Sequence, residues 1–554
     1  MSLRSVIPVL LAAAAVAWCA IALDAPAVAA VAVGAAAALI GLLPLRRAEP
    51  RTASGMLAHR LGYLWRRRTH RAQEFPQAFD VPLPDGGSYG LRWDGDRLLT
   101  MLRINPPPDA LTLLRPGSLS TDQVLPLTDI ARCLVQFDIA LASIDVISIG
   151  ARTAQTGFVA QLYDRIIGPL PAIAHRTVWL VLRLDPLANA AAVDRRGGGG
   201  TGVTRSAIIA TRRVANRLAA RDIAVSVLTA TEMNNAVREL TRGITLAELT
   251  ETPTTLRHND LHLTSYEIGA GLISSRGFAD IWATQSRSTT VTLRLRTAAD
   301  NPAQRDREPM IALDAVVRFD TTHEFAEPPV PGLRALPGRQ LPTLLACLPT
   351  GSHAHRSART SHRGPLPALT GLVVPTGGCG QLIGADELGQ GIAVPLAGDG
   401  TRHLDVIGTL ALAQQVILRA IALGARVVVH SDRPEAWHSM VTNVGSPYWL
   451  SMAPRSAAAS HPPAAPQPGA PAPTASMLVF DGIAPAASPG GATIVHVRPS
   501  RDPGGSFDAD VTLVQDDRTP NQITVRTAGA STTVHMVTTP DEMRYIGESL
   551  IAVR

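Results

Sequence analysis

Two long apolar runs open the chain. The segments Val6–Leu23 and Pro26–Leu45 contain no charged residue, and only Asp24 and Ala25 separate them. Each run is close to the roughly 20 residues that a helix needs to cross a bilayer. Residues 1–45 are therefore predicted to form a two-helix transmembrane hairpin, with its membrane-spanning ends at Val6, Leu23, Pro26 and Leu45.

A cleaved signal peptide is the alternative interpretation of this region. Arg4 precedes the first apolar run, and the small residues Ala27–Ala30 offer a cleavage site. The apolar stretch continues for fifteen residues beyond that site, to Leu45. This continuation favours the hairpin.

A basic segment follows the hairpin, over residues 46–75. Only Glu49 and Glu74 oppose its arginines, and the surplus of positive charge equals the whole formal net charge of +6. The positive-inside rule places this segment in the cytoplasm, beside anionic inner-leaflet lipid, and an even number of spans places both termini there too. The arginines are Arg46, Arg47, Arg51, Arg60, Arg66, Arg67, Arg68 and Arg71.

Apolar residues recur at helical spacing within the basic segment, from Met56 and Leu57 to Leu64 and Trp65. This pattern predicts a juxtamembrane helix. Such a helix either lies in the membrane interface or continues the second span and packs on the soluble part of the chain. Both interpretations fit the pattern.

Residues 76–323 alternate between strand and helix patterns. The clearest signal is a hairpin, in which an Asp-Gly turn at Asp94–Asp96 joins the strands Tyr89–Trp93 and Arg97–Ile104. Alternation of this kind predicts a layered α/β lobe. The predicted helices are Leu127–Phe137, Val159–Ile167, Val203–Ala220 and Thr231–Thr241, and the other strands are Ser143–Ile149, Thr177–Leu184, Ile223–Leu228, Val291–Thr297 and Ile311–Phe319.

The rest of the chain divides by composition. A linker rich in Pro, Gly and His (324–365) precedes a second lobe (366–455), which contains a βαβ pattern over Leu404–His430. A Pro/Ala-rich linker (456–476) cannot bury a core. It precedes a strand-rich part (477–554) that closes with a helix beginning at Pro540. The predicted fold is thus a membrane-anchored α/β protein in two lobes with a strand-rich C-terminal part.

Composition excludes several functions. The chain contains no lysine, so all 51 basic residues are arginine. Walker A ATPases, pyridoxal enzymes and protein kinases all need a lysine. The four cysteines are too far apart for a disulfide scaffold or a thiolate zinc site: Cys19, Cys133, Cys347 and Cys379.

The candidate binding motifs are weak. Gly197–Gly200 precedes a helix, as a phosphate loop does, but a flexible loop is the favoured interpretation. Gly408 offers one glycine where a dinucleotide-binding loop needs three, and Gly377–Gly380 suits a tight turn.

Three histidines cluster in the first linker without a carboxylate, which argues against a metal site: His353, His355 and His362. No nucleophile–base pair has recognisable spacing. The expectation is therefore a protein with no catalytic, cofactor-binding or metal-binding residues. Since the excess charge is confined to the basic segment, no nucleic-acid partner is expected either.

The order of these features resembles the EccE component of the mycobacterial type VII (ESX) secretion system, over residues 1 to about 440. The matching stretches are the hairpin, Arg92–Gly95, Trp179, Arg183–Pro186, Arg196–Gly199, Trp282, Gly424–Arg426, Arg433-Pro434 and Trp437. The resemblance implies a structural, non-catalytic subunit of an inner-membrane protein-export complex. Its partners would be the EccB, EccC and EccD components, of which EccC is the ATPase.

Two alternatives remain. A membrane-anchored, glycosyltransferase-like enzyme of envelope biosynthesis would suit the α/β architecture, but the sequence lacks a D-x-D pair at a strand end. A secreted envelope protein would follow if the first apolar run were a signal peptide.

Overall fold

The computed structural model describes most of residues 75–547 and short pieces of the N-terminal region. Between 75 and 547 the exceptions are 84–85, 108–110, 155–156, 299–309, 351–360, 398–402, 454–474, 486–490 and 500–507. The N-terminal pieces are 13–19, 21–22, 26, 29, 31–33, 35–36, 44–45 and 51–52.

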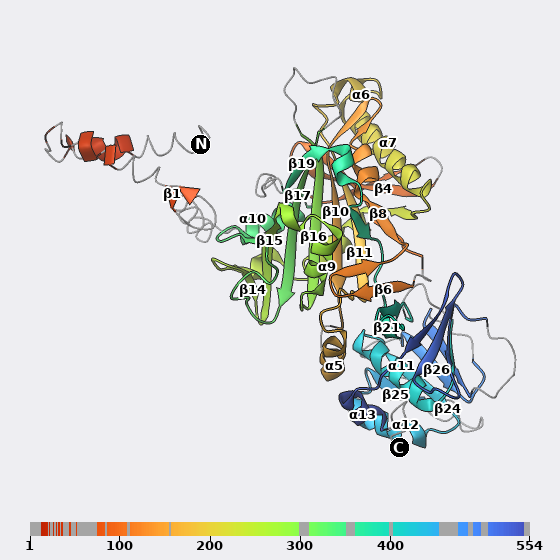
Figure 1. The fold of residues 1–554 in the computed structure, drawn as a ribbon. Coiled ribbons are helices and arrows are strands. Elements are labelled where there is room, and N and C mark those ends of the chain that lie inside the picture. Colours follow the sequence, from red (N-terminus) through yellow and green to blue (C-terminus); the bar gives the residue numbers. More distant parts are fainter. Residues whose placement is uncertain are drawn as a thin grey trace, which may run out of the picture.

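The N-terminal pieces lie apart from the two large sheets (Figure 1). Residues 13–19, 21–22, 29, 31–33 and 35–36 are helical, and strand β1 (Pro44–Leu45) pairs with β2 (Arg51–Thr52). Across the residues described, no helix has both the length and the hydropathy to span a membrane. The predicted span ends Val6 and Leu23 lie outside the described residues, as do all the basic-segment arginines except Arg51.

The first sheet has 14 strands, and its neighbouring strands are antiparallel. Its main path runs β13-β14-β15-β17-β16-β10-β11-β5-β4-β3. In that order the strands are Thr250–Glu251, Leu256–His258, Leu261–Ile268, Met310–Thr321, Ser288–Thr297, Ile139–Ala151, His175–Leu184, Arg97–Ile104, Ser88–Asp94 and Phe79–Pro82. Short strands off this path are β9 (Val135–Gln136), β12 (Val225–Val227), β18 (Leu333–Ala335) and β19 (His362–Pro365).

Helices cover both faces of the first sheet. One face packs against α4 (Leu127–Arg132), α7 (Gly199–Ala219) and α9 (Ser275–Ala283). The other face packs against α8 (Ala230–Leu240) and α10 (Gln340–Cys347). The central strands are therefore buried along nearly their whole length, on both faces.

The second sheet has 12 strands, in the order β25-β24-β26-β27-β23-β28-β29-β30-β21-β22-β6-β7. The part from β25 to β28 is parallel, and the remainder is antiparallel. In sheet order the strands are Leu450–Met452, Val427–Ser431, Met477–Asp481, Thr493–Arg498, His403–Ile407, Val511–Gln515, Gln522–Thr527, Ser531–His535, Gln381–Ala385, Gly391–Val394, Thr112–Arg115 and Ser118–Ser120. Strands from residues 403–452 thus alternate in the sheet with strands from residues 477–515. The last two strands, β6 and β7, come from a much earlier part of the sequence.

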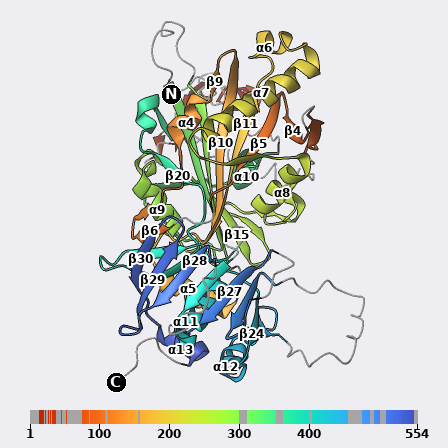
Figure 2. The same ribbon diagram turned by 90° about the vertical axis from the view of Figure 1, so that its right-hand side faces the viewer.

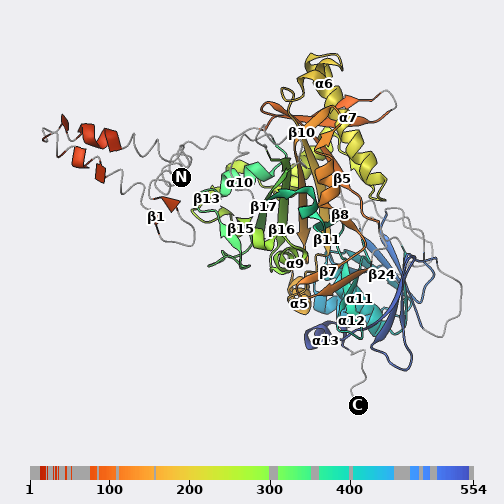
Figure 3. The same cartoon turned by 45° about the horizontal axis from the view of Figure 1, so that its top comes forward.

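Among the described residues, helices cover one face of the parallel part. Figures 1 and 3 show α11 (Leu410–Ala422), α12 (Glu435–Val444) and α13 (Pro540–Ile546) on the same side of these strands. Burial alternates accordingly: in β28, Val511 and Leu513 are buried while Thr512 and Val514 are half-exposed. Figure 2 shows β27, β28 and β29 from the open side, with α5 (Phe158–Ile167) and α11 behind them.

The mixed α/β architecture predicted from the sequence is confirmed. The Asp94–Asp96 hairpin forms β4 and β5, and the Pro540 helix begins where expected, with Thr539 and Glu542 in a capping box. The predicted helix Thr231–Thr241 begins one residue earlier, as α8, because Thr229 accepts a hydrogen bond from the Glu232 N–H and so caps the helix.

Two local predictions were wrong. The helix predicted over Leu127–Phe137 ends at Arg132, and the chain then turns into the β9–β10 hairpin through Phe137, which has φ of 54°. The glycine run Gly197–Gly200 is not a flexible loop: Gly197 and Gly198 end a tight connection from α6 (Ala190–Asp194), and Gly199 and Gly200 begin α7. A Cβ on Gly202, one turn further, would collide with the Val193 backbone.

Candidate functional site: an arginine-lined pocket

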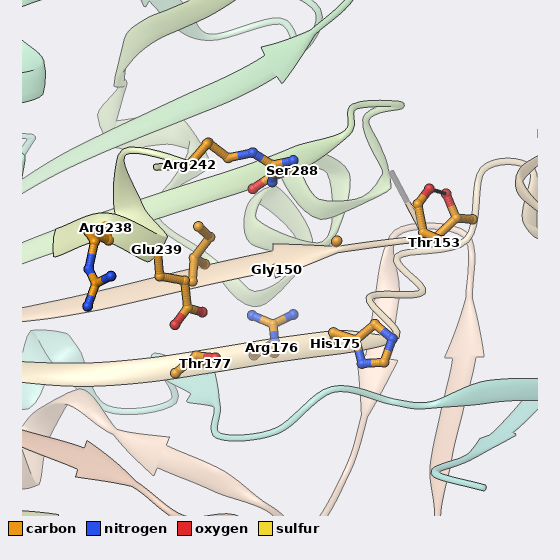
Figure 4. A pocket seen from close by; sticks show the side chains of 12 residues that line it. Gly150, Thr153, His175, Arg176, Thr177, Arg238, Glu239, Arg242 and Ser288 are labelled. Carbon is orange, nitrogen blue, oxygen red and sulfur yellow. Dashed lines mark hydrogen bonds between the residues drawn. The ribbon is translucent and has the colours of Figure 1, made fainter. Parts of the chain in front are cut away.

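A pocket of about 390 Å³ lies between the C-terminal turn of α8 and one end of the first sheet (Figure 4). Strands β10, β11 and β16 form its floor, and α8 contributes its charged wall. The residues that line it are Ile149, Gly150, Ala151, Thr153, Ala154, His175, Arg176, Thr177, Arg238, Glu239, Arg242 and Ser288. We call it the Arg242 pocket.

Arg242 and Ser288 form one end of this pocket. Arg242 lies just beyond α8 with φ of 59°, and Figure 4 shows its guanidinium beside Ser288. Ser288 is only 1% exposed, yet its Oγ has no hydrogen-bond partner in the part of the chain described. Buried hydroxyl groups are nearly always hydrogen-bonded. The Ser288 Oγ therefore leaves room for a hydrogen bond with a polar atom at this position.

Neighbouring charges do not fully neutralise Arg242. Burial lowers the pKa of its guanidinium; Asp320 acts in the opposite direction, and Arg318 and Arg287 add to the lowering. The Asp320 carboxylate is itself held by Arg318 in two hydrogen bonds, of 2.8 and 3.2 Å. Positive charge therefore remains available at Arg242.

Glu239 lies beside Arg238 on the α8 wall of the pocket (Figure 4). Desolvation by the surrounding protein raises the pKa of its carboxyl, against the effects of a hydrogen bond with Thr177 and of Arg103. Arg238, in the last turn of α8 and four residues before Arg242, is exposed and donates to Asn235. The two arginines and one carboxylate give this wall a surplus of one positive charge.

Arg176 contributes to the floor but has a different environment. It is 9% exposed, its guanidinium stacks on the Trp282 ring at 4.0 Å, and it donates to the Ser148 Oγ at 3.2 Å. Burial lowers the pKa of Arg176 to about 10. These contacts fix its side chain against α9.

The Arg242 pocket adjoins the junction of the two sheets. The His175 imidazole Nε2 lies 2.7 Å from the Leu423 carbonyl, which follows α11. The Ala154 N–H donates to the Ala422 carbonyl at 2.8 Å. The rim of the pocket therefore contacts the second lobe.

This arrangement is suited to binding. Glu239 is the pocket's only carboxyl group, so its lining lacks the pair of carboxylates that general acid–base chemistry on a sugar would use. Across the described residues, no group of three or more histidine, cysteine or acidic side chains could hold a metal ion. Arginine, hydroxyl and backbone groups are instead typical of oxyanion recognition.

The parallel part of the second sheet has the layout of a nucleotide-binding fold, with α11 beginning directly after β23. In such folds phosphate binds at the helix N-terminus. Here the Gln515 side chain occupies that position: its Oε1 accepts from the Thr409 N–H at 2.6 Å, and its Nε2 donates to the Pro520 carbonyl at 2.7 Å. A Cβ on Gly408 would lie 2.5 Å from the same Oε1.

Residues that carry the family resemblance meet inside the first sheet. Arg183 pairs with Asp94 at 3.2 Å and with Asp145, and Arg294 donates to the same Asp145 at 2.8 and 2.9 Å. Although burial opposes ionisation, the two arginines hold the pKa of Asp145 well below its usual range. In the second lobe Arg433 and the Trp437 indole both donate to the buried Asp481. These motif residues hold the fold together.

The other candidates from the sequence are scattered. His362 lies in β19, whereas His353 and His355 lie outside the described residues. Gly378 passes so close to the Ala174 carbonyl that a Cβ would not fit, and the segment continues into β21 as expected. Arg238, Arg242 and Ser288 were not among the residues predicted from the sequence; their only signal is the four-residue spacing of the two arginines at the end of α8.

Fold and pocket together define a two-sheet α/β protein with buried ion pairs and one arginine-lined pocket among the described residues. The sequence profile of the family described as "type VII ESX secretion system translocon, EccE" matches residues 172–268. This segment includes six of the residues lining the Arg242 pocket. Over this segment the chain is similar to the EccE family.

Characterised relatives align over larger parts of the chain. The ESX-2 secretion system protein EccE2 of Mycobacterium tuberculosis is 27% identical over 64% of this chain and 63% of its own length. The ESX-1 secretion system protein EccE1 of Mycolicibacterium smegmatis is 31% identical over 29% of this chain and 35% of its own length. EccE1 of M. tuberculosis is 25% identical over 66% of this chain and 70% of its own length. The chain thus spans between about one third and two thirds of the length of these relatives.

Proposed function

We propose that this protein is a non-catalytic structural subunit of an inner-membrane type VII (ESX) secretion complex, in which it stabilises the assembly and supports protein export. Similarity to the EccE family and to its relatives EccE2 and EccE1 is the observation that carries this proposal. The buried pairing of Arg183 with Asp94 and Asp145 supports a structural role, because all three side chains are at most 2% exposed and pair with one another.

The energy for export would come from a partner. The chain has no lysine for a Walker A motif, and Gln515 fills the position where a nucleotide-binding fold holds phosphate. The proposed partners are the EccB, EccC and EccD components, with EccC as the ATPase. Purification in mild detergent, followed by identification of the subunits that co-purify, tests this part directly.

We further propose that residues 1–45 anchor the protein in the inner membrane and that both termini are cytoplasmic. The described helical pieces of this region expose apolar side chains, including Trp18 at 75% and Val31 at 67%. Such exposure suits contact with lipid or with other membrane helices. A reporter fused after Arg71 should be active in the cytoplasm, and activity only in the periplasm would contradict the topology.

The basic segment offers a sharper test. Changing Arg66, Arg67 and Arg68 to Glu should weaken attraction to anionic lipid by roughly 1 kcal/mol for each positive charge removed. The variant should comigrate less with the large membrane complex on a native gel. The control carries the same charge change at Arg205, Arg257 and Arg518, which are exposed positions of the soluble part. Equal comigration of both variants would show that the basic segment has no role in assembly beyond setting topology.

A further inference from the structure

A second polar pocket continues from the Arg242 pocket. It has a volume of about 220 Å³ and shares Thr153 and Ala154 with its neighbour. Its other walls carry mainly hydroxyl, amide and charged side chains, including Gln161, Gln285 and Thr322. Together the two pockets form a groove along the end of the first sheet, which we call the sheet-end groove.

The charged groups of the second pocket already have partners. Asp164 accepts from Arg152 at 2.8 Å, and Arg287 pairs with Asp260 at 3.2 Å. The uncompensated positive charge of the groove is thus concentrated at the α8 wall, beside Arg242. A ligand that carries one negative charge there would complement the groove.

The polar position beside Arg242 points independently to a ligand. The Ser288 Oγ is buried and lacks a partner among the described residues, and it lies next to the Arg242 guanidinium (Figure 4). One hydroxyl donor beside a planar guanidinium suits a carboxylate, which accepts from both. Glu239, on the same α8 wall of the pocket, can accept a hydrogen bond from a ligand N–H or O–H.

We propose that the sheet-end groove binds an extended segment of an acidic polypeptide, with one side-chain carboxylate placed between Arg242 and Ser288. The polar walls of the second pocket favour a peptide over a phospholipid, because acyl chains would need an apolar surface. The polypeptide is either a subunit of the secretion complex or an exported protein. This inference goes beyond the structural role proposed above.

Photocrosslinking in cells separates these two sources. A p-benzoylphenylalanine placed at Thr153, on the ridge shared by the two pockets, should form an adduct with an acidic segment, and mass spectrometry identifies whether that segment belongs to a subunit or to an exported protein. The yield should fall at least fivefold when Arg242→Gln is added. An unchanged yield would overturn the proposal.

Direct binding provides the decisive test. The probes are two pools of fluorescein-labelled nonapeptides with randomised uncharged flanks, one with a central Glu and one with a central Gln. Binding to the full-length protein in mild detergent is followed by fluorescence anisotropy. The Glu pool should bind at least tenfold more tightly, Arg242→Gln should abolish this preference, and Ser288→Ala, which removes only one hydroxyl, should reduce it about threefold.

The control is Arg132→Gln on α4, which packs on the other face of the sheet and should leave the preference unchanged. Equal binding of both pools, no binding of either, or a preference that survives both Arg242→Gln and Ser288→Ala would overturn the proposal. Binding of phosphatidylglycerol vesicles that depends on Arg242 and displaces the Glu pool would instead assign the groove to lipid. Since none of these readouts requires the assembled complex, they can fail independently of the structural role.

Discussion

The two sheets differ in how their faces are covered. The antiparallel first sheet has helices on both faces, so strands such as β17 are buried along almost their whole length. The parallel part of the second sheet has α11, α12 and α13 on one face, and Val428, Leu478 and Thr512 on the other face remain half-exposed. Parallel sheets usually have both faces covered, whereas antiparallel ones often leave one face to solvent. Here the usual pattern is reversed.

The sheets also differ in how they accommodate charge. In the first sheet charged side chains lie within doubly covered strands, where Asp145 is 0% exposed and each of its arginines is held in place. In the second sheet Asp405 lies on the face opposite α11, is 2% exposed, and pairs with Arg498 at 2.7 Å. Asp145 thus compensates two arginines, one of them only 1% exposed, whereas Asp405 pairs with one arginine that is 13% exposed.

The largest expected effect is at Asp145. Asp145→Asn should lower the free energy of unfolding by about 3–5 kcal/mol, because it leaves two buried guanidinium groups poorly compensated. Urea denaturation followed by tryptophan fluorescence measures this loss. The control, Asp96→Asn in the exposed β4–β5 turn, should change stability by less than about 0.5 kcal/mol. Equal effects of the two variants would contradict the assignment of Asp145 to the core.

The matching substitution in the second sheet should cost less. Asp405→Asn removes the partner of Arg498, whose side chain is 13% exposed and can reach water. We expect a loss of about 1.5–3 kcal/mol, the range for hydrogen bonds to charged groups. If Asp405→Asn proves as costly as Asp145→Asn, the face that carries Asp405 is covered in the folded protein, and the contrast between the sheets fails.

The α11 N-terminus tests the resemblance of the second sheet to a nucleotide-binding fold. Gln515→Ala removes two hydrogen bonds and should cost about 1–2 kcal/mol in the same urea assay. A fluorescent ATP analogue should still not bind, because opening the position does not supply the missing lysine. Gln515→Glu keeps the acceptor for the Thr409 N–H and serves as the control. Nucleotide binding by either variant would show that Gln515 blocks a functional site.

The smallest effect concerns mild acid. Because the pKa of Asp145 is lowered in the folded state, its contribution to stability is complete above the unfolded value near 4 and is lost only as the pH falls below it. Between pH 7 and pH 5 stability should therefore change little through this group. Urea midpoints at pH 5, 4 and 3 should drop more steeply for the wild type than for Asp145→Asn, and parallel curves would contradict this linkage.

Local patterns predicted much of this fold. The continuous apolar run Thr177–Leu184 indicated a strand buried on both faces, and β11 is one. The Asp-Gly turn and the Pro540 start are short-range signals, and both were confirmed. The helix predicted over Leu127–Phe137 failed because β9 pairs with β10, a tertiary contact that overrides the helical spacing.

The pocket could not be predicted in the same way. Arg242 and Ser288 are 46 positions apart in the printed sequence, and only the pairing of β16 with β10 and the packing of α8 bring them together. Likewise, no local sequence pattern predicts that β26 and β27 lie between β24 and β23 in the sheet. Long-range strand order is set by packing of whole elements, which no short motif encodes.

The structural role proposed above makes assembly of the secretion complex depend on this protein. The most direct measurement compares cells that lack the protein with cells that have it restored, using native gels for the EccB–EccC–EccD assembly and secretion assays for export. We expect cells that lack the protein to lose both the assembly and export, and cells in which it is restored to recover both. An intact assembly that fails to export would contradict it, because the protein would then act on an already stable complex.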